Sequence, residues 1–293
     1  MFVAKTAERE QVKLMLGVTG PSGAGKTLSS LLIAYGLTKD WTKIILADTE
    51  NRSALYYAGD KTGPWKHLDF PPTLKNGYHP DNWCALIDYA QADPDCEVLI
   101  LDSITHEWNG VGGCLDTQTR LGGRFEHWAK VTPMHNRFID KMRNSNLHII
   151  ATMRSKQDYT VELNEKGKNA PTKVGLASIQ REGTDYEFGV IFDMGMNHYA
   201  KASKDRTGLF APKDMFQIGS ETGEELLAWV NSGKAPVIPI FDKENVKQVD
   251  WLKKKVEEKY FTFVLNALHG KVIDKNSFNE VLEIAKTLEA QEG

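Results

Sequence analysis

The sequence predicts an α/β fold in which helices flank a mostly parallel central sheet, with a small helical segment at the C-terminal end. Short apolar runs typical of buried strands alternate with longer helix-like segments, an order that favours parallel strands. The first strand-like run also leads through a glycine-rich turn into the helix-like segment 27-TLSSLLIAYGL-37, as in a βα unit. A chain of 293 residues is long enough to bury a substantial core of this kind.

The strands of the sheet are expected at five apolar runs. Each is short, is bounded by polar or turn-forming residues, and has the aliphatic composition of a buried strand. The runs are 12-VKLMLGV-18, 43-KIILAD-48, 97-EVLILD-102, 147-LHIIATM-153 and 189-GVIFDMG-195.

Helices are expected between these strands. Besides 27–37, two segments have helical character, namely 81-DNWCALIDYAQ-91 and 125-FEHWAKVTPMHNRFIDKMRN-144. The second contains Pro133, which removes one backbone N–H from a helix, so a bend is expected there.

The C-terminal part of the chain is expected to be separate from the sheet. The segment 232-SGKAPVIPIF-241 contains two prolines and a glycine and predicts a linker. The predicted organisation is a core of residues 1–232 and a helical segment of residues 242–293. In that segment, 277-SFNE-280 has the form of a capping box ahead of a helix over 281–288.

Composition and charge narrow the classes of function. Apolar residues make up 41% of the chain, charged residues 26%, and the net charge is −3, so any nucleic-acid binding must come from local basic patches. No apolar run approaches the roughly 20 residues of a membrane span, and the N-terminal MFVAKTAERE lacks the apolar core of a signal peptide. We therefore expect a cytoplasmic protein without a membrane partner. The spacing of the three cysteines indicates free thiols and no zinc site; they are Cys84, Cys96 and Cys114.

The glycine-rich turn matches the pattern G-x-x-x-x-G-K-T of a phosphate-binding loop. Glycines let successive N–H groups point inward at phosphate oxygens, and the following helix adds the positive end of its dipole. Lys26 would reach the β- and γ-phosphates of ATP, and Thr27 would ligate Mg²⁺. An ordinary glycine-rich strand-to-helix turn is the alternative. The expected nucleotide contacts are Gly20, Pro21, Ser22, Gly23, Ala24, Gly25, Lys26, Thr27 and Leu28.

A second nucleotide-binding element is expected at 98-VLILD-102. Four apolar residues ending in an acid make a buried strand that delivers one carboxylate to the carboxyl edge of the sheet. There Asp102 can hold the Mg²⁺ hydration shell opposite Thr27. Buried strands that end in Asp also occur by chance, so this assignment depends on the phosphate-binding loop.

The order of acidic residues resembles that of the RecA and RadA ATPases. After the phosphate-binding loop, the next strand ends in 48-DTE-50, and 98-VLILDS-103 carries a serine after its aspartate. The resemblance implies a RecA-like P-loop NTPase core and places the catalytic glutamate at Glu50, where it would orient an attacking water. Alternatively, Glu50 caps a following helix over 52–59.

A basic element downstream strengthens this resemblance. The segment 201-KASKDRTGLF-210 is similar to the RadA element K-x-R-x-G, with Thr207 where RadA proteins have phenylalanine. The resemblance implies that Lys204 and Arg206 reach the nucleotide of a neighbouring subunit, where an arginine stabilises transition-state charge. A β-turn with solvated charges is the alternative. By its position alone, Arg154 corresponds to a polar sensor of the nucleotide state.

Residues 12 to 230 most resemble the short RecA-like ATPases of tailed phages and prophages, which are associated with recombination and single-strand annealing. Distinctive stretches are 164-NEKGK-168, 180-QREG-183 and 203-SKDRTGLF-210. The resemblance implies that two loops, 104–124 and 155–175, face single-stranded DNA. Their candidate DNA-binding residues are Trp108, Arg120, Arg124, Tyr159, Lys166, Lys168 and Lys173.

Local charge is consistent with DNA binding. Residues 154–181 carry six Lys/Arg and three Asp/Glu, and residues 120–143 carry six and two, in a chain of net charge −3. Lysines in long loops can follow a phosphate backbone, and an aromatic ring offers a stacking face to a base. A solvated hairpin would have the same lysines, and Trp108 and Trp128 could equally be core residues.

Three functions fit these observations. The first is a DNA-dependent recombination ATPase that uses ATP and Mg²⁺ and assembles on single strands as a homo-oligomeric filament or ring, with other phage recombination or replication proteins as further partners. The second is a nucleotide kinase, because 20-GPSGAGKT-27 is also similar to the loop of guanylate kinases; however, no Arg-rich lid is evident. The third is a non-catalytic module that uses ATP as a switch, and Glu50 distinguishes it from the first.

Overall fold

The computed structural model describes residues 6–163, 169–234, 241–271, 273 and 275–292. The chain divides into two compact units, Met1–Gly233 and Lys234–Gly293. Most of the predicted linker, residues 235–240, lies outside the described residues.

The first unit is built around one central sheet. Its strands follow the order β3-β2-β4-β5-β1-β7-β8, and β6 pairs with β5 outside this path. Strands β3, β2, β4, β5, β1 and β7 are parallel, whereas β8 is antiparallel to β7 and β6 is antiparallel to β5. The strands are β1 (Met15–Gly20), β2 (Ile44–Asp48), β3 (Lys66–Asp69), β4 (Val98–Asp102), β5 (His148–Leu163), β6 (Asn169–Ser178), β7 (Val190–Met194) and β8 (Ala200–Asp205).

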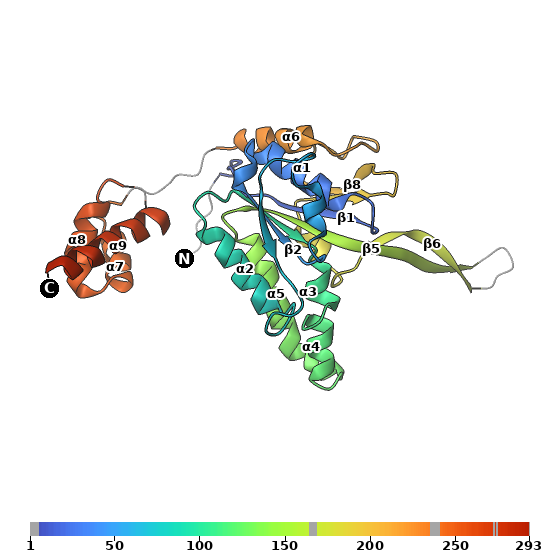
Figure 1. Cartoon of the computed structure of the whole chain (residues 1–293), viewed down its shortest axis with the longest axis horizontal. Coiled ribbons are helices and arrows are strands. Elements are labelled where there is room, and N and C mark those ends of the chain that lie inside the picture. The colour runs from blue at the N-terminus through green and yellow to red at the C-terminus, as the bar shows by residue number, and fades with distance from the viewer. Residues whose placement is uncertain (1–5, 164–168, 235–240, 272, 274, 293) are drawn as a thin grey trace. The chain divides into compact units, whose positions relative to one another are not determined.

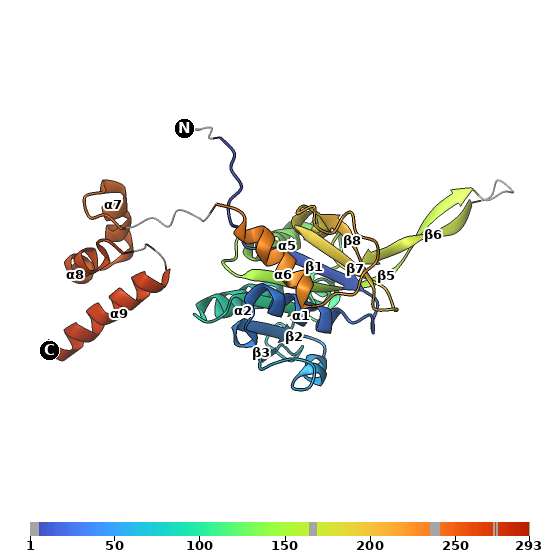
Figure 2. The same ribbon diagram turned by 90° about the horizontal axis from the view of Figure 1, so that it is seen from above.

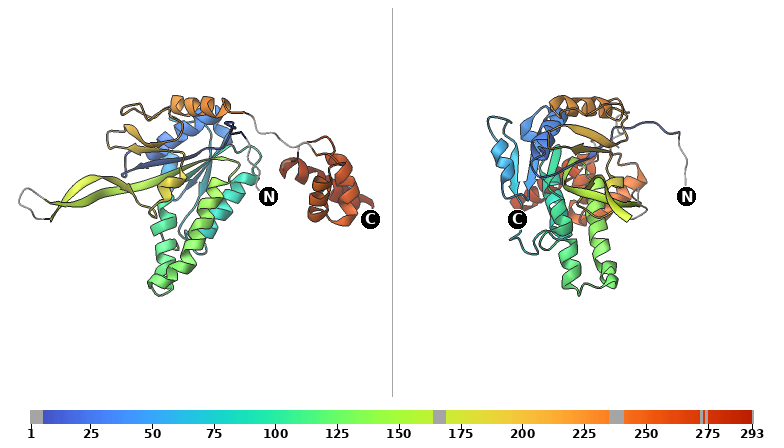
Figure 3. Two further views of the ribbon diagram at one scale, coloured as in Figure 1. Left: turned by 180° about the vertical axis from the view of Figure 1, so that it is seen from behind. Right: turned by 90° about the vertical axis from the view of Figure 1, so that its right-hand side faces the viewer.

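Helices cover both faces of this sheet. Helices α1 and α6 lie on one face and α2 and α5 on the other, as Figures 1 and 2 show. Two short helices, α3 and α4, follow β4 and lead toward α5 (Figure 3). The bounds are α1 (Lys26–Thr38), α2 (Pro80–Ala92), α3 (Thr105–Asn109), α4 (Cys114–Arg120), α5 (Trp128–Arg143) and α6 (Ser220–Asn231), with 3₁₀ helices η1 (Trp41–Lys43), η2 (Ser53–Tyr57), η3 (Phe125–His127) and η4 (Thr184–Glu187).

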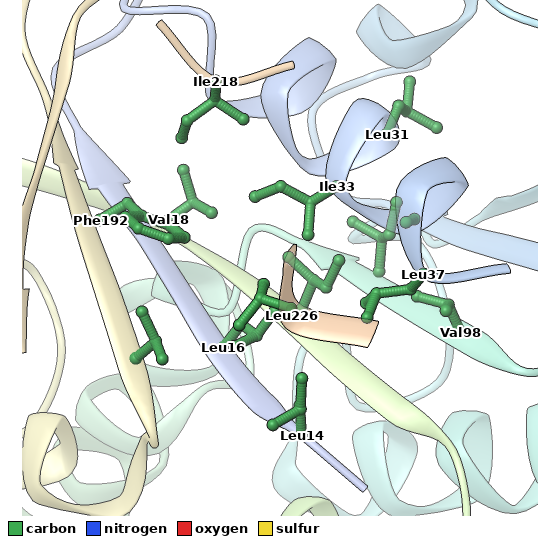
Figure 4. Close-up of a cluster of buried hydrophobic side chains, with 14 of the residues drawn as sticks. Leu14, Leu16, Val18, Leu31, Ile33, Leu37, Val98, Phe192, Ile218 and Leu226 are labelled. Atoms are coloured by element: carbon green, nitrogen blue, oxygen red, sulfur yellow. The ribbon is translucent and has the colours of Figure 1, made fainter. Parts of the chain in front are cut away.

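The apolar runs form two cores because successive strand residues face opposite sides of the sheet. In β2, Ile44 and Leu46 belong to the core beneath α1 and α6, whereas Ile45 and Ala47 belong to the core beneath α2 and α5. Figure 4 shows the first core, where Leu16 of β1 and Leu226 of α6 are fully buried. A strand covered on both faces therefore reads as a continuous apolar run.

Two glycines bring α1 and α6 into direct backbone contact. A Cβ on Gly36 would lie 2.0 Å from the carbonyl oxygen of Ser220, and a Cβ on Gly223 would lie 2.1 Å from that of Ile33. Only glycine allows such an approach. This contact fixes the helix that follows the glycine-rich turn.

The predicted α/β class with a mostly parallel sheet is confirmed. Strand β1 begins at Met15 and continues through Gly20, later than the predicted run, and β3 and β8 were not predicted. These two strands carry charged residues, including Lys66 and Lys204, because both lie at the edges of the sheet, where one side is open to water.

The predicted loop over 155–175 is wrong for most of its length. Strand β5 continues to Leu163 and pairs with β6 as an antiparallel ribbon, with Tyr159 opposite Lys173 in the register. The segment 159-YTVEL-163 is rich in strand-forming residues, a signal that its neighbouring glycines and lysines concealed. Residues 164–168 lie outside the described residues.

The second unit is a set of three helices among the described residues of this part of the chain, α7 (Val246–Lys255), α8 (Glu258–Leu268) and α9 (Lys275–Glu292). It has its own core, which includes Leu252, Val264, Leu268 and Val281. The predicted capping box is wrong, because α9 begins at Lys275 and Ser277 lies inside it. In the parts of the chain described, no helix is long and apolar enough to cross a membrane.

Candidate active site

The nucleotide-binding candidates meet at the carboxyl edge of the parallel strands. The loop after β1, the end of β2, the end of β4 and a residue within β5 line one cavity of about 220 Å³. Parallel strands all end at the same edge, so residues distant in sequence converge there. The cavity is lined by Ser22, Gly23, Gly25, Lys26, Thr27, Glu50, Ser53, Tyr56, Tyr57, Asp102 and Arg154.

Residues 20–28 form the turn between β1 and α1 and the first turn of α1. Gly23 and Gly25 have φ values of 84° and 94°, in the left-handed region that favours glycine. A Cβ on Gly25 would also lie 3.3 Å from Nδ1 of His198. Helix α1 starts at Lys26, so its first N–H groups lack partners within the helix and can bind an anion.

The lysine of this loop lies across it. Nζ of Lys26 donates hydrogen bonds to the carbonyl oxygens of Gly20 and Pro21, both at 3.0 Å. Burial lowers the pKa of Lys26, and the charges of Asp102 and Glu50 oppose that effect. The ammonium group is therefore held in the cavity where phosphates would lie.

Asp102 is a buried carboxylate held by two hydroxyl groups. Its Oδ2 accepts a hydrogen bond from Oγ1 of Thr27 at 2.6 Å, and its Oδ1 accepts one from Oγ1 of Thr152 at 2.5 Å. Burial raises the pKa of Asp102, while these two hydrogen bonds lower it. A hydroxyl and a carboxylate at this distance are the oxygen donors that Mg²⁺ prefers, so Thr27 and Asp102 fit the metal that ATP carries.

Glu50 is paired with Arg154 inside the same cavity. Nε and Nη2 of Arg154 both donate to the two oxygens of the Glu50 carboxylate, with Nε at 2.9 Å from Oε1. Glu50 raises the pKa of Arg154. The following 3₁₀ helix has Arg52 as its N-cap residue without a side-chain cap, and Oδ2 of Asp48 accepts the N–H of Ala54 within it at 3.0 Å. Glu50 thus faces the cavity and does not cap this helix.

The loop after Glu50 supplies cavity residues that sequence reasoning missed. Ser53, Tyr56 and Tyr57 line the cavity, and the side chain of Tyr56 is 86% exposed. The aromatic rings of Tyr56 and Tyr57 offer flat faces to a base near the phosphate-binding loop. Two consecutive tyrosines shortly after a catalytic-type acid were the available signal in the sequence.

Lys204 and Arg206 lie outside this cavity. Nζ of Lys204 donates to the carbonyl oxygens of Asp185 at 2.8 Å and Tyr186 at 2.7 Å, and Nη2 of Arg206 donates to that of Tyr186 at 3.2 Å. Asp205 organises the turn after β8, accepting the N–H groups of Thr207 and others up to residue 211. The segment thus forms a turn, as the alternative interpretation of this basic element expected. Neither Lys204 nor Arg206 lines the cavity that contains Lys26 and Glu50.

Of the candidate DNA residues after β4, Trp108 belongs to an aromatic pair, whereas Arg120 and Arg124 form ion pairs with neighbouring acids. The rings of Trp108 and Trp128 stack with centroids 5.5 Å apart, and they line a largely apolar cavity with Phe125, which is 89% exposed. Arg120 pairs with Asp116 within α4. The sequence did not single out Phe125, although it follows Arg124 directly.

The remaining DNA candidates can be placed only in part. Tyr159 and Lys173 lie on paired strands of the β5–β6 ribbon, and Lys166 and Lys168 fall outside the described residues. Several basic residues over 120–143 are paired with acids, three of which come from other segments. The ion pairs are Arg137 with Asp81, Lys141 with Asp88, and Arg143 with Asp140 and Glu187.

Helix α3 connects the cavity with this aromatic pair. Oγ1 of Thr105 accepts the backbone N–H of Arg154 at 2.9 Å, and Nδ1 of His106 lies 2.7 Å from Oγ1 of Thr49, next to Glu50. Trp108 lies two residues further along. One short helix therefore contacts both the nucleotide candidates and the DNA candidates.

Comparison with known proteins identifies the family of the core. The model of a family described as AAA domain matches residues 12–222. No curated protein matches the chain. The match extends over all of the cavity residues and both cations after β8, and it stops within α6.

Proposed function

We propose that this chain, which belongs to the AAA domain family, is a RecA-like ATPase that binds single-stranded DNA in recombination or annealing. Membership of the family suggests the P-loop NTPase fold and nucleotide-binding ATPase activity. The observation that carries the ATPase part is the convergence of Lys26, Thr27, Glu50 and Asp102 on one cavity.

The loop and α1 would bind the phosphates of ATP. The first N–H groups of α1 and the ammonium group of Lys26 face the cavity and supply positive charge there. For this, Nζ of Lys26 leaves the carbonyl oxygens of Gly20 and Pro21 and takes phosphate oxygens as acceptors. Bound Mg²⁺, held by Thr27 and Asp102, would neutralise charge on the phosphate oxygens.

Glu50 would act as the base that orients the attacking water. The water oxygen attacks the γ-phosphorus, the bond from that phosphorus to the bridging oxygen breaks, ADP leaves, and the water proton passes to solvent through Glu50 or the phosphate. Because both carboxylate oxygens of Glu50 accept bonds from Arg154, hydrolysis requires this pair to open. The guanidinium group of Arg154 could then bind the negatively charged phosphate oxygens of ATP.

Lys204 and Arg206 support an assembly of several subunits. Neither side chain lines the nucleotide cavity of this chain. Both donate hydrogen bonds to backbone carbonyl oxygens of Asp185 or Tyr186 at the surface. In a homo-oligomer, whether filament or ring, they would reach the cavity of a neighbour and stabilise transition-state charge in trans.

Single-stranded DNA is proposed as the ligand of the surface around α3 and α4 and of the β5–β6 ribbon. Support comes from the exposed ring of Phe125 beside Trp108, and from the lysines of residues 166–173. Stacking on aromatic rings and contacts to phosphates carry little base specificity. Together with the sequence resemblance to short phage and prophage proteins, DNA binding of this kind suggests that the protein acts with other phage recombination or replication proteins in the host cytoplasm.

The test is the steady-state rate of ATP hydrolysis with and without single-stranded DNA, with Lys26→Ala as the variant without the loop cation. We expect DNA to raise the rate of the wild-type protein and to leave the variant inactive. Phosphate transfer to nucleoside monophosphates would instead identify a kinase. Tight ATP binding with no turnover, even on DNA, would favour a switch module.

A further inference from the structure

Three chemically reactive side chains from α3, α4 and α5 meet in the interior of the first unit. Glu107 of α3, Cys114 of α4 and His135 of α5 are 0%, 0% and 3% exposed. Each offers one ligand atom, and these three atoms lie within 4.8 Å of one another. Neither the ATPase site nor the DNA candidates use this cluster.

All contacts in the cluster converge on the carboxylate. Sγ of Cys114 donates to Oε1 of Glu107 at 3.0 Å, and Nδ1 of His135 lies 3.1 Å from Oε1 and 3.3 Å from Oε2. Nε2 of Gln180 donates to Oε2 at 3.3 Å. The carboxylate is thus oriented from outside by an amide, as metal-binding carboxylates usually are.

Charge balance favours a bound dication. A carboxylate that is fully removed from water is costly unless a positive charge compensates it. A divalent cation together with a thiolate, a carboxylate and a neutral imidazole gives a neutral site. Arg181 is another positive charge near the thiol of Cys114.

Donor type and spacing both fit zinc. A sulfur, an imidazole nitrogen and a carboxylate oxygen are its usual ligands, at about 2.3, 2.0 and 2.1 Å. Tetrahedral angles then place sulfur about 3.6 Å and nitrogen about 3.4 Å from the carboxylate oxygen. The observed 3.0 and 3.1 Å would lengthen by about 0.6 and 0.3 Å. The sulfur and nitrogen, which lie within 4.8 Å of each other, would settle about 3.5 Å apart, and side-chain rotation can supply these movements. His135 also borders a cavity of about 310 Å³, a route for a water as fourth ligand.

We propose that Glu107, Cys114 and His135 bind a zinc-type divalent cation that joins α3, α4 and α5. Gln180 positions the carboxylate and does not itself bind the ion. This inference does not depend on ATP hydrolysis or on DNA binding. Three ligands from three different helices close long chain segments, so the ion would stabilise the part of the unit that carries the aromatic pair.

The direct test uses metal alone on the full chain without nucleotide. Zn²⁺ titrated by calorimetry should bind one equivalent, and Co²⁺ in its place should give thiolate charge-transfer and tetrahedral absorption bands. Cys114→Ser keeps a hydrogen-bond donor to Glu107 but loses the thiolate, so the charge-transfer band should disappear. Binding should weaken by more than the roughly 10–100-fold expected for Gln180→Ala, which removes only the outer partner.

Matched variants separate this site from other effects. Cys96→Ser makes the same substitution at another buried cysteine, in the core beneath α2, and should keep the cobalt spectrum. Asp102→Asn should impair the Mg²⁺-dependent nucleotide site and leave zinc binding intact.

The proposal is overturned if the folded wild-type protein binds no Zn²⁺ at micromolar concentrations. It is equally overturned if its cobalt spectrum lacks the thiolate band or is the same in Cys114→Ser. In those cases the cluster is a hydrogen-bonded contact between helices. The wild-type measurement decides this even where a variant fails to fold.

Discussion

The candidate active site and the candidate DNA surface differ in how their groups are positioned. Lys26, Asp102 and Arg154 follow or lie on adjacent parallel strands, so sheet pairing alone brings them together. In contrast, Arg120 and Trp108 lie on short helices after β4, and their surroundings come from other segments. A site at the edge of a sheet can therefore be predicted from local motifs, whereas a charged surface cannot. The four predictions below test this difference.

The largest effect is expected at Arg206, which we propose acts on the nucleotide of a neighbouring subunit. Arg206→Ala should lower the ATPase rate by about 10³-fold or more, as loss of an arginine that acts on the γ-phosphate does. Mixing it with Lys26→Ala should restore part of the activity, because some interfaces then combine an intact loop with an intact arginine.

The exposed Lys201 of β8, the strand that ends just before Arg206, provides a control, since Lys201→Ala should hydrolyse ATP normally. If subunits shown to co-assemble gain no activity at any mixing ratio, Arg206 does not act in trans.

The next effect is expected at Glu50. Glu50→Gln should retain ATP binding, measured with a fluorescent analogue, and should lose about 10²–10⁴-fold in turnover, because the carboxylate that orients water is gone. Asp60→Asn, at an exposed acid shortly after it in the chain, should change neither quantity. Normal turnover of Glu50→Gln would leave the site with a binding role only.

A smaller effect is expected from three lysines of the segment 166–173. Replacing Lys166, Lys168 and Lys173 by alanine should weaken binding to single-stranded DNA and reduce the salt slope by about 2, since each phosphate contact contributes about 0.7. Fluorescence anisotropy over a range of salt concentrations measures both. The matched triple variant over 253–255, in the second unit, should bind like the wild-type protein. An unchanged salt slope in the variant of Lys166, Lys168 and Lys173 would show that these lysines do not contact the DNA phosphates.

The last prediction concerns the pH dependence of stability, which no activity assay reports, and the amino end of β5. Burial lowers the pKa of His148 to about 3, and its Nδ1 accepts the N–H of Leu14 at 3.1 Å. Below its ordinary pKa of about 6.5, the unfolded chain takes up a proton that the folded chain refuses. The free energy of unfolding should therefore fall as the pH drops from about 6.5 toward 3, by up to about 1.4 kcal/mol per pH unit from this group.

Urea unfolding followed by tryptophan fluorescence measures this slope. His148→Asn places an amide oxygen near the position of Nδ1 and removes the titration, so its profile should be flatter over the same range. Identical slopes in both proteins would show that other groups dominate the acid dependence.

Sequence reasoning located the sheet and the groups at its carboxyl edge because both depend on local patterns. The run 98-VLILD-102 reveals a buried strand and its terminal carboxylate together. The pairing of Glu50 with Arg154 could not be predicted from the sequence, because it depends on a contact between residues 104 positions apart in the chain. The roles of both residues in hydrolysis stay predictions.

Other parts of the molecule escaped prediction for physical reasons of the same kind. The strand character of 159–163 was hidden by the glycines and lysines that follow it. The cysteine spacing gave no indication of the cluster around Glu107, because its ligands come from three helices and meet only after folding. Tyr56 has a place in the cavity only because a 3₁₀ helix turns it there.

The length of β5 has a mechanical consequence. Arg154 and Leu163 lie nine residues apart on one uninterrupted strand, a distance of about 30 Å at roughly 3.3 Å per residue. The register of the pairing of β5 with β6 shifts between Asp158 and Tyr159, and such an irregularity bends a ribbon locally. Over the part before this shift, from Arg154 to Asp158, the strand spans about 13 Å, so a rotation of about 6° beside Glu50 would displace Asp158 by about 1.4 Å.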